Sequence, residues 1–189
     1  MIWIEAAATF FGILAVWLTV KRNILCWPTG LIQVLLYIYI FFVVKLYSDL
    51  ILHVVYVFLQ FFGWYNWLHG GDDHGELEVS GLKRWRLAGW VFLGLAGTLA
   101  WGWGMARFTD ASLPYPDAFT TVMSLVATWL MAKKKLDSWF FWIAVDVIAI
   151  GVYYYKGLYL TCGLYSVFLI LATIGYFAWQ RALPELLPA

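Results

Sequence analysis

The sequence has 189 residues, of which 64% are hydrophobic, 21% aromatic and 12% charged, and its mean hydropathy is +0.80. Soluble domains carry about 25% charged residues, and a soluble fold of this length has too little interior to bury so much apolar surface. The formal net charge of +1 also argues against a nucleic-acid-binding protein. Composition therefore excludes a disordered chain and a soluble enzyme, and it indicates an integral membrane protein.

Charged and turn residues divide the chain into seven apolar stretches, each close to the roughly 20 residues that a helix needs to cross a bilayer. They cover residues 3–20, 28–44, 50–69, 86–106, 116–132, 139–155 and 158–180. The first stretch has neither the basic flank nor the cleavage site of a signal peptide, so we expect it to be a mature helix. The fold class predicted is all-α integral membrane, with seven transmembrane helices.

Seven crossings place the two termini on opposite sides of the membrane, and the basic residues predict which side is which. Three of them, Lys45, Arg107 and Lys156, fall on the side of the N-terminus, whereas the other nine fall on the side of the C-terminus. Because cytoplasmic loops are enriched in Lys and Arg, we expect the N-terminus outside and the C-terminus in the cytoplasm.

An internal repeat appears when the chain is aligned with itself at an offset of 112 residues. Between Ala6 and Trp67, 15 of 62 positions are identical to their partners, among them Trp27 with Trp139. The repeated unit is three helices, and an even number of crossings separates the two copies, so both have the same orientation. This predicts two parallel three-helix repeats joined by a linker helix, the 3+1+3 plan of the SWEET sugar transporters.

The repeat also predicts the domain boundaries. Residues 1–69 form the first three-helix bundle, residues 70–112 a cytoplasmic loop and the linker helix, and residues 113–189 the second bundle. In transporters built from such repeats, the substrate lies near the middle of the membrane between the bundles.

Asp146 is the one acidic residue expected in the middle of a span, where a carboxylate needs a partner or a water-filled cavity. Trp139 and Trp142 precede it at seven and four positions, so all three share one helical face. Aromatic faces attract flat organic cations, which makes this face a candidate binding surface for one. The alternative is that Trp139 anchors the helix at the interface and Asp146 bonds a neighbouring helix.

The third span carries a second polar stripe that includes Gln60 and Trp64, with Asn66 on a neighbouring face. An amide both donates and accepts hydrogen bonds, which suits the hydroxyl groups of a sugar. In the second span, Gln33 and Tyr37 are one turn apart and could line the same cavity. The alternative for these amides is hydrogen bonding between helices.

Several chemistries have no motif in this sequence. It has no phosphate-binding loop, no His, Cys and Asp cluster with metal-ligand spacing, and no evident nucleophile and base pair. We therefore expect neither an enzyme nor a metal or organic cofactor.

Four segments make the sequence similar to the PnuC family of bacterial vitamin transporters. They are Trp27 to Gly30, Gln60 to Trp67, Ser138 to Asp146, and Leu164 through Gly175 to Trp179. The resemblance covers nearly the whole chain. The family is known for uptake of nicotinamide riboside, and some members transport thiamine or riboflavin.

The resemblance implies a seven-helix, SWEET-like homotrimer in the bacterial inner membrane. It implies facilitated diffusion, with the vitamin trapped by phosphorylation in the cytoplasm. It also implies a binding site drawn from two spans, at the positions Trp139, Trp142, Asp146, Gln60, Trp64 and Asn66.

The pocket chemistry ranks the vitamins of this family. Nicotinamide riboside carries a pyridinium cation and a ribose, which match the aromatic face with Asp146 and the amides. Thiamine, also a flat cation, ranks second, and riboflavin, which is neutral and larger, ranks third. We expect alternating access around this site. The alternative from a different class is a membrane scaffold protein, in which Asp146, Trp142 and Gln60 would make separate helix contacts.

Overall fold

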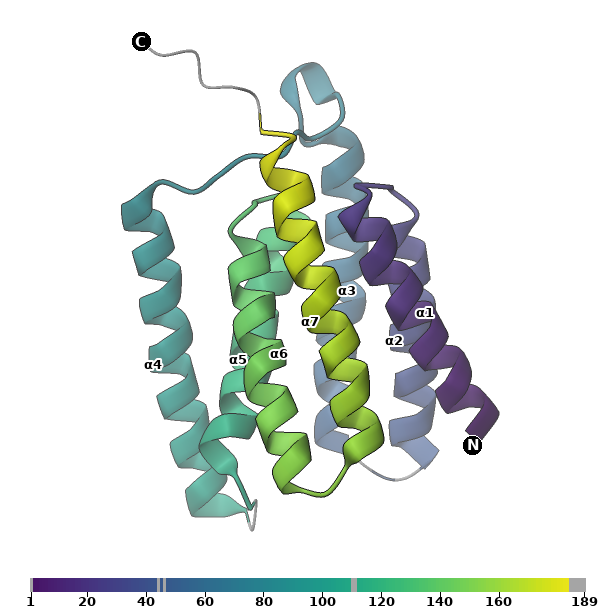
Figure 1. The fold of residues 1–189 in the computed structure, drawn as a ribbon, viewed down its shortest axis with the longest axis vertical. Coiled ribbons are helices and arrows are strands. Elements are labelled where there is room, and N and C mark those ends of the chain that lie inside the picture. The colour runs from purple at the N-terminus through teal and green to yellow at the C-terminus, as the bar shows by residue number, and fades with distance from the viewer. Residues whose placement is uncertain (1, 44, 46, 110–111, 184–189) are drawn as a thin grey trace. The chain divides into compact units, whose positions relative to one another are not determined.

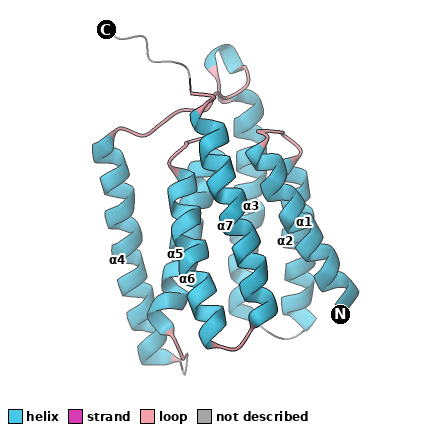
Figure 2. Ribbon diagram, viewed as in Figure 1, coloured by secondary structure: helices cyan, strands magenta, loops and turns pink. Residues whose placement is uncertain are grey.

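The computed structural model describes residues 2–43, 45, 47–109 and 112–183, and in them the chain is almost entirely helical (Figures 1 and 2). The long helices are α1 (Ile2–Val20), α2 (Cys26–Val43), α3 (Tyr47–His69), α4 (Arg84–Phe108), α5 (Pro114–Ala132), α6 (Ser138–Tyr155) and α7 (Tyr159–Gln180). A short 3-10 helix, η1 (Asp72–His74), follows α3. Each of the seven predicted stretches coincides with one long helix, so the predicted all-α fold is confirmed.

One of these helices, α5, differs from the others in composition. The other six are long and apolar enough to cross a membrane, judged over the described residues. Asp117 and several hydroxyl side chains lower the hydropathy of α5, yet Ala118, Ala127 and Leu130 in it are at most 1% exposed. A helix covered by protein needs fewer apolar side chains than one that faces lipid, which explains the difference. That residues 116–132 cross the membrane stays a prediction.

The chain divides into two compact units, which are described separately. The first unit comprises Met1–Glu78 together with the short segment Ala132–Lys134. In it, α2 packs against both α1 and α3 (Figure 1). The buried indoles of Trp27 and Trp67 form much of its core.

The second unit comprises Val79–Met131 and Lys135–Ala189, and it contains α4 to α7. Its core joins α5 to α6 and consists of Met123, Val126, Ala127, Leu130, Phe141 and Val145. Helix α4 approaches α5 through glycines, since a Cβ at Gly94 would lie 2.6 Å from the sulfur of Met123. The remaining pair, α6 and α7, forms an antiparallel hairpin.

The two units share a tryptophan motif at positions that the repeat pairs. In the first, Trp27 meets Trp67 edge-on with ring centroids 5.4 Å apart and covers Gly63. In the second, Trp139 meets Trp179 edge-on at 5.5 Å. Gly175, the partner of Gly63, lies under the Trp139 ring. The 112-residue offset therefore pairs side chains with the same local geometry.

The turns of the two units also correspond. Arg22 and Lys134, 112 residues apart, have left-handed φ angles of 57° and 51°, and Lys45 and Gly157 have φ angles of 60° and 71°. Non-glycine residues seldom adopt this conformation. The α1–α2 turn therefore has a left-handed residue at the same position as the α5–α6 turn, and the α2–α3 turn has one at the same position as the α6–α7 turn.

Candidate functional site

Asp146 lies in the middle of α6 in the second unit and is only 3% exposed. Within the described ranges, no hydrogen bond or ion pair reaches its carboxylate. Burying a carboxylate without a partner is costly unless a proton, water or a cation accompanies it. Asp146 is therefore a candidate counter-charge for a positively charged ligand.

Trp142 lies one turn before Asp146 on the same helix. It is half-buried and packs against the core cluster between α5 and α6. Its indole is thus fixed on one side by protein while part of its surface stays open. This is the arrangement that a stacking surface for a flat ligand requires.

Trp139 is in a different situation, because its ring is 1% exposed and lies against Trp179 and Gly175. Its faces are therefore already occupied by protein. Its indole N–H, however, is buried with no hydrogen-bond partner in the described part of the chain. The same is true of the N–H of Trp27, its partner in the repeat. This shared environment favours a packing role for the Trp139 ring.

The two glutamines of the first unit fill the space above glycines on neighbouring helices. The amide nitrogen of Gln60 lies 2.7 Å from where a Cβ on Gly30 would stand, and that of Gln33 lies 2.7 Å from the same point on Gly12. Both side chains are half-buried. Gln60 therefore lies at the α2–α3 contact and Gln33 at the α1–α2 contact.

Tyr37 belongs to an aromatic cluster around His53 in the first unit. The His53 ring lies 5.7 Å from Tyr37 and 4.9 Å from Phe41. The repeat matches the contact of Phe41 and His53 with that of Tyr153 and Tyr165, at 5.1 Å in the second unit. The neighbourhood of Tyr37 in the structure is thus aromatic, on the α2–α3 side of its helix.

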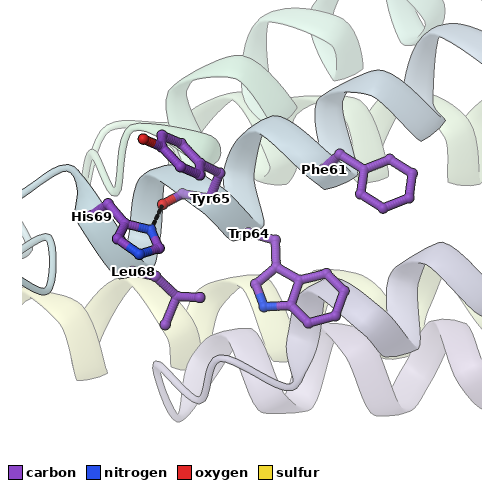
Figure 3. Close-up of a pocket in the computed structure, with 5 residues that line it drawn as sticks. All are labelled: Phe61, Trp64, Tyr65, Leu68 and His69. Carbon is purple, nitrogen blue, oxygen red and sulfur yellow. Dashed lines mark hydrogen bonds between the residues drawn. The ribbon is translucent and has the colours of Figure 1, made fainter.

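Trp64 and Asn66 lie near the C-terminal end of α3. Trp64 lines a shallow depression of about 220 Å³, and Figure 3 shows that the lining side chains all come from this one helix. They are Phe61, Trp64, Tyr65, Leu68 and His69. The Asn66 amide donates a 2.8 Å hydrogen bond to the carbonyl of Ala132, so one of its donors is used within the first unit.

Most of the candidate residues stand where the two halves of the chain differ. The offset of 112 pairs Gly30 with Trp142, Val34 with Asp146, and Gln60 with Ala172. The packing motif is thus repeated, whereas the groups suited to ligand binding occur in one copy. Such a distribution is expected when a duplicated scaffold carries one site.

Sequence reasoning missed Lys134, which looked like one of three solvated lysines in a loop. It is only 8% exposed, and its Nζ donates a 2.6 Å hydrogen bond to the carbonyl of Leu77. The same atom lies 4.5 Å from the centre of the Trp67 ring. Burial lowers the pKa of this lysine, an effect that the nearby charge of Glu76 opposes. The pairing of Lys134 with the exposed Arg22 in the repeat gives no signal of this burial.

Comparison with known proteins assigns the family. Residues 2–181 match the family model described as nicotinamide mononucleotide transporter. The chain belongs to this transporter family. The predicted resemblance to PnuC proteins is thereby confirmed, and the family is one of transporters rather than enzymes.

Several known transporters align with nearly the whole chain. The nicotinamide riboside transporter PnuC of Escherichia coli is 27% identical over 97% of this chain and 87% of its own. The riboflavin/roseoflavin transporter RibM of Streptomyces davaonensis is 24% identical over 95% and 85%. The crystal structure of the vitamin B3 transporter PnuC is 26% identical, covers 95% of this chain and 81% of its own, and superposes with a TM-score of 0.76.

Proposed function

We propose that the chain is a membrane transporter of nicotinamide riboside. The observation that carries the proposal is the buried carboxylate of Asp146, which has no protein partner within the described ranges and follows the half-open indole of Trp142 by one turn. A pyridinium ring needs a π-face and a counter-charge, and these two residues supply both. The names of the PnuC relatives support the same substrate.

The proposed site combines two helices. Trp142 and Asp146 receive the pyridinium ring, and Gln60 supplies the amide for the ribose hydroxyls, assisted by Trp64 and Asn66. Gln33 and Tyr37 line the approach from α2. Trp139 acts as a positioning residue, because its ring packs on Trp179 while its N–H has no partner among the described residues.

The proposed transport mechanism is facilitated diffusion by alternating access. The matched tryptophan motifs and turns support two parallel three-helix bundles, 1–69 and 113–189, joined by the segment 70–112 that contains α4. The two bundles rock about the central site. The N-terminus lies outside the bacterial inner membrane and the C-terminus inside. The protein assembles as a homotrimer, and phosphorylation in the cytoplasm traps the vitamin.

Thiamine is the second candidate substrate, because it is also a flat cation that would use Asp146. Riboflavin ranks third: it is the substrate in the name of RibM, but it is neutral and gives a counter-ion no role. The charge of the vitamin therefore separates the candidates, because only the two cations interact favourably with the Asp146 carboxylate.

The test is binding and uptake with purified protein. A ligand that binds only the folded state raises the melting temperature, so we expect nicotinamide riboside to raise it most in a panel with thiamine, riboflavin and nicotinamide mononucleotide. In proteoliposomes without an ion gradient, we expect radiolabelled nicotinamide riboside to equilibrate and to exchange with unlabelled vitamin. If no vitamin shifts the melting temperature and none exchanges, the transporter assignment is wrong and a scaffold role is favoured.

A further inference from the structure

The backbone passes from one unit to the other at three peptide bonds, 78–79, 131–132 and 134–135. All three lie in the α3–α4 and α5–α6 connections or at their edges. These connections run side by side, since Ser80 and Lys135 form a parallel bridge. Any change in the arrangement of the two units must therefore be absorbed within this short paired region.

Within the first unit, Lys134 holds the α5–α6 connection against the α3–α4 connection. Its Nζ donates to the carbonyl of Leu77 at 2.6 Å, and the N–H of Leu77 donates to the carbonyl of Trp67 at 3.0 Å. Two residues earlier, the carbonyl of Ala132 accepts from Asn66 at 2.8 Å. The segment 132–134 is thereby fixed to the end of α3.

On the side of the second unit, a separate set of bonds holds the residues that follow. The N–H of Leu136 donates to the carbonyl of Ser80 at 2.9 Å, and Lys135 Nζ donates to the Ser80 hydroxyl at 2.7 Å. The N–H of Leu82 donates to the carboxylate of Asp137 at 2.6 Å. The segments 80–82 and 135–137 are thus fixed to each other within the second unit.

We propose that residues 78–79 and 134–135, which lie between these two sets of bonds, form the hinge between the two units and that Lys134 is the residue that positions it. Hinges are a few loop residues whose φ and ψ angles change while clamped elements on either side stay rigid. Here the bond between Lys134 and Lys135 joins two such clamps. The role in transport rests on the proposed function, whereas the hinge itself does not.

The first experiment measures the hinge without any ligand. Spin labels on Asn23→Cys in the first unit and Arg181→Cys in the second, with Cys26 and Cys162 replaced by serine, report the distance between units by pulsed electron resonance. We expect Lys134→Met, which keeps the aliphatic stem and removes the donor, to widen the distance distribution at least twofold. Lys83→Met removes the same charge from an exposed lysine outside the hinge and is expected to leave the width unchanged.

A second variant protects the test against loss of folding. Asn66→Ala removes the bond to Ala132 and leaves Lys134 in place, so it should widen the distribution in the same direction. The hinge is overturned if Lys134→Met or, should that variant not fold, Asn66→Ala gives the width of the unsubstituted protein. It is also overturned if Lys83→Met widens the distribution as much.

The second experiment separates the hinge from the proposed function. Calorimetry with nicotinamide riboside is expected to give Lys134→Met a Kd within twofold of wild type, while its uptake rate in proteoliposomes differs at least fivefold. If the wild type neither binds nor transports this vitamin, the proposed function fails and the spin-label result still decides the hinge. If the wild type transports and Lys134→Met transports equally fast, the role of the hinge in transport is overturned.

Discussion

Trp27 and Trp139, 112 residues apart, occupy the same local environment in the two units. Each indole meets a second tryptophan edge-on, at 5.4 and 5.5 Å, and each covers a glycine, Gly63 on α3 and Gly175 on α7. The contact leaves no room for a methyl group. The packing of both units is therefore expected to depend on Gly63 and Gly175.

We expect Gly63→Ala and Gly175→Ala each to destabilise the protein by about 1–3 kcal/mol, the usual cost of overpacking a core. The added Cβ would lie within 2.5 Å of Trp139 at Gly175, and closer still to Trp27 at Gly63. The check is the midpoint of unfolding in detergent. Gly151→Ala is the matched control, since its Cβ would meet nothing within 4 Å and alanine favours helix. Equal midpoints for all three variants would contradict the packing described.

Lys134 predicts a pH dependence of stability. Its pKa is lowered from 10.5 by burial, so the unfolded chain keeps the proton to a higher pH than the folded chain. Between the lowered pKa and 10.5 the unfolded state therefore binds more protons, and the free energy of unfolding rises with pH. Lys134→Met should lose this part of the rise, and Lys133→Met should keep it. Melting temperatures between pH 7.5 and 10.5 measure the difference, and parallel curves for the two variants would refute the assignment.

The ion pair between Lys156 and Asp117 is expected to contribute little. Its atoms are 3.0 Å apart, but the two side chains are 29% and 28% exposed, so solvent screens the attraction. A double-mutant cycle with Lys156→Met and Asp117→Asn should give a coupling below about 1 kcal/mol that decreases with added salt. A larger coupling that does not respond to salt would show that the pair is shielded from solvent.

The helices were predictable because apolar runs of membrane length leave the backbone few alternatives. The repeat was predictable because residues such as Trp27 and Gly63 have no freedom to change once they pack together. The buried state of Asp146 also followed from its position in an apolar run. These features depend on local sequence and on composition.

Other features depend on contacts that one-dimensional patterns do not contain. Trp139 was predicted as a ligand surface with Trp142 because they share a helical face, but packing against Trp179 covers the Trp139 ring. Lys134 was overlooked because three consecutive lysines are typical of a solvated loop. Only a left-handed turn and the nearby end of α3 bring its ammonium group to Leu77 and Trp67.

The central claim is that Asp146 is the counter-charge for a cationic vitamin, and the most direct measurement is calorimetry with Asp146→Asn. This variant keeps the shape of the side chain and removes its charge. We expect the Kd for nicotinamide riboside to rise at least tenfold, about 1.4 kcal/mol, with the melting temperature unchanged or higher. Asp117→Asn removes a carboxylate from the ion pair with Lys156 and should leave the Kd within twofold. A Kd for Asp146→Asn equal to that of the wild type would contradict the claim.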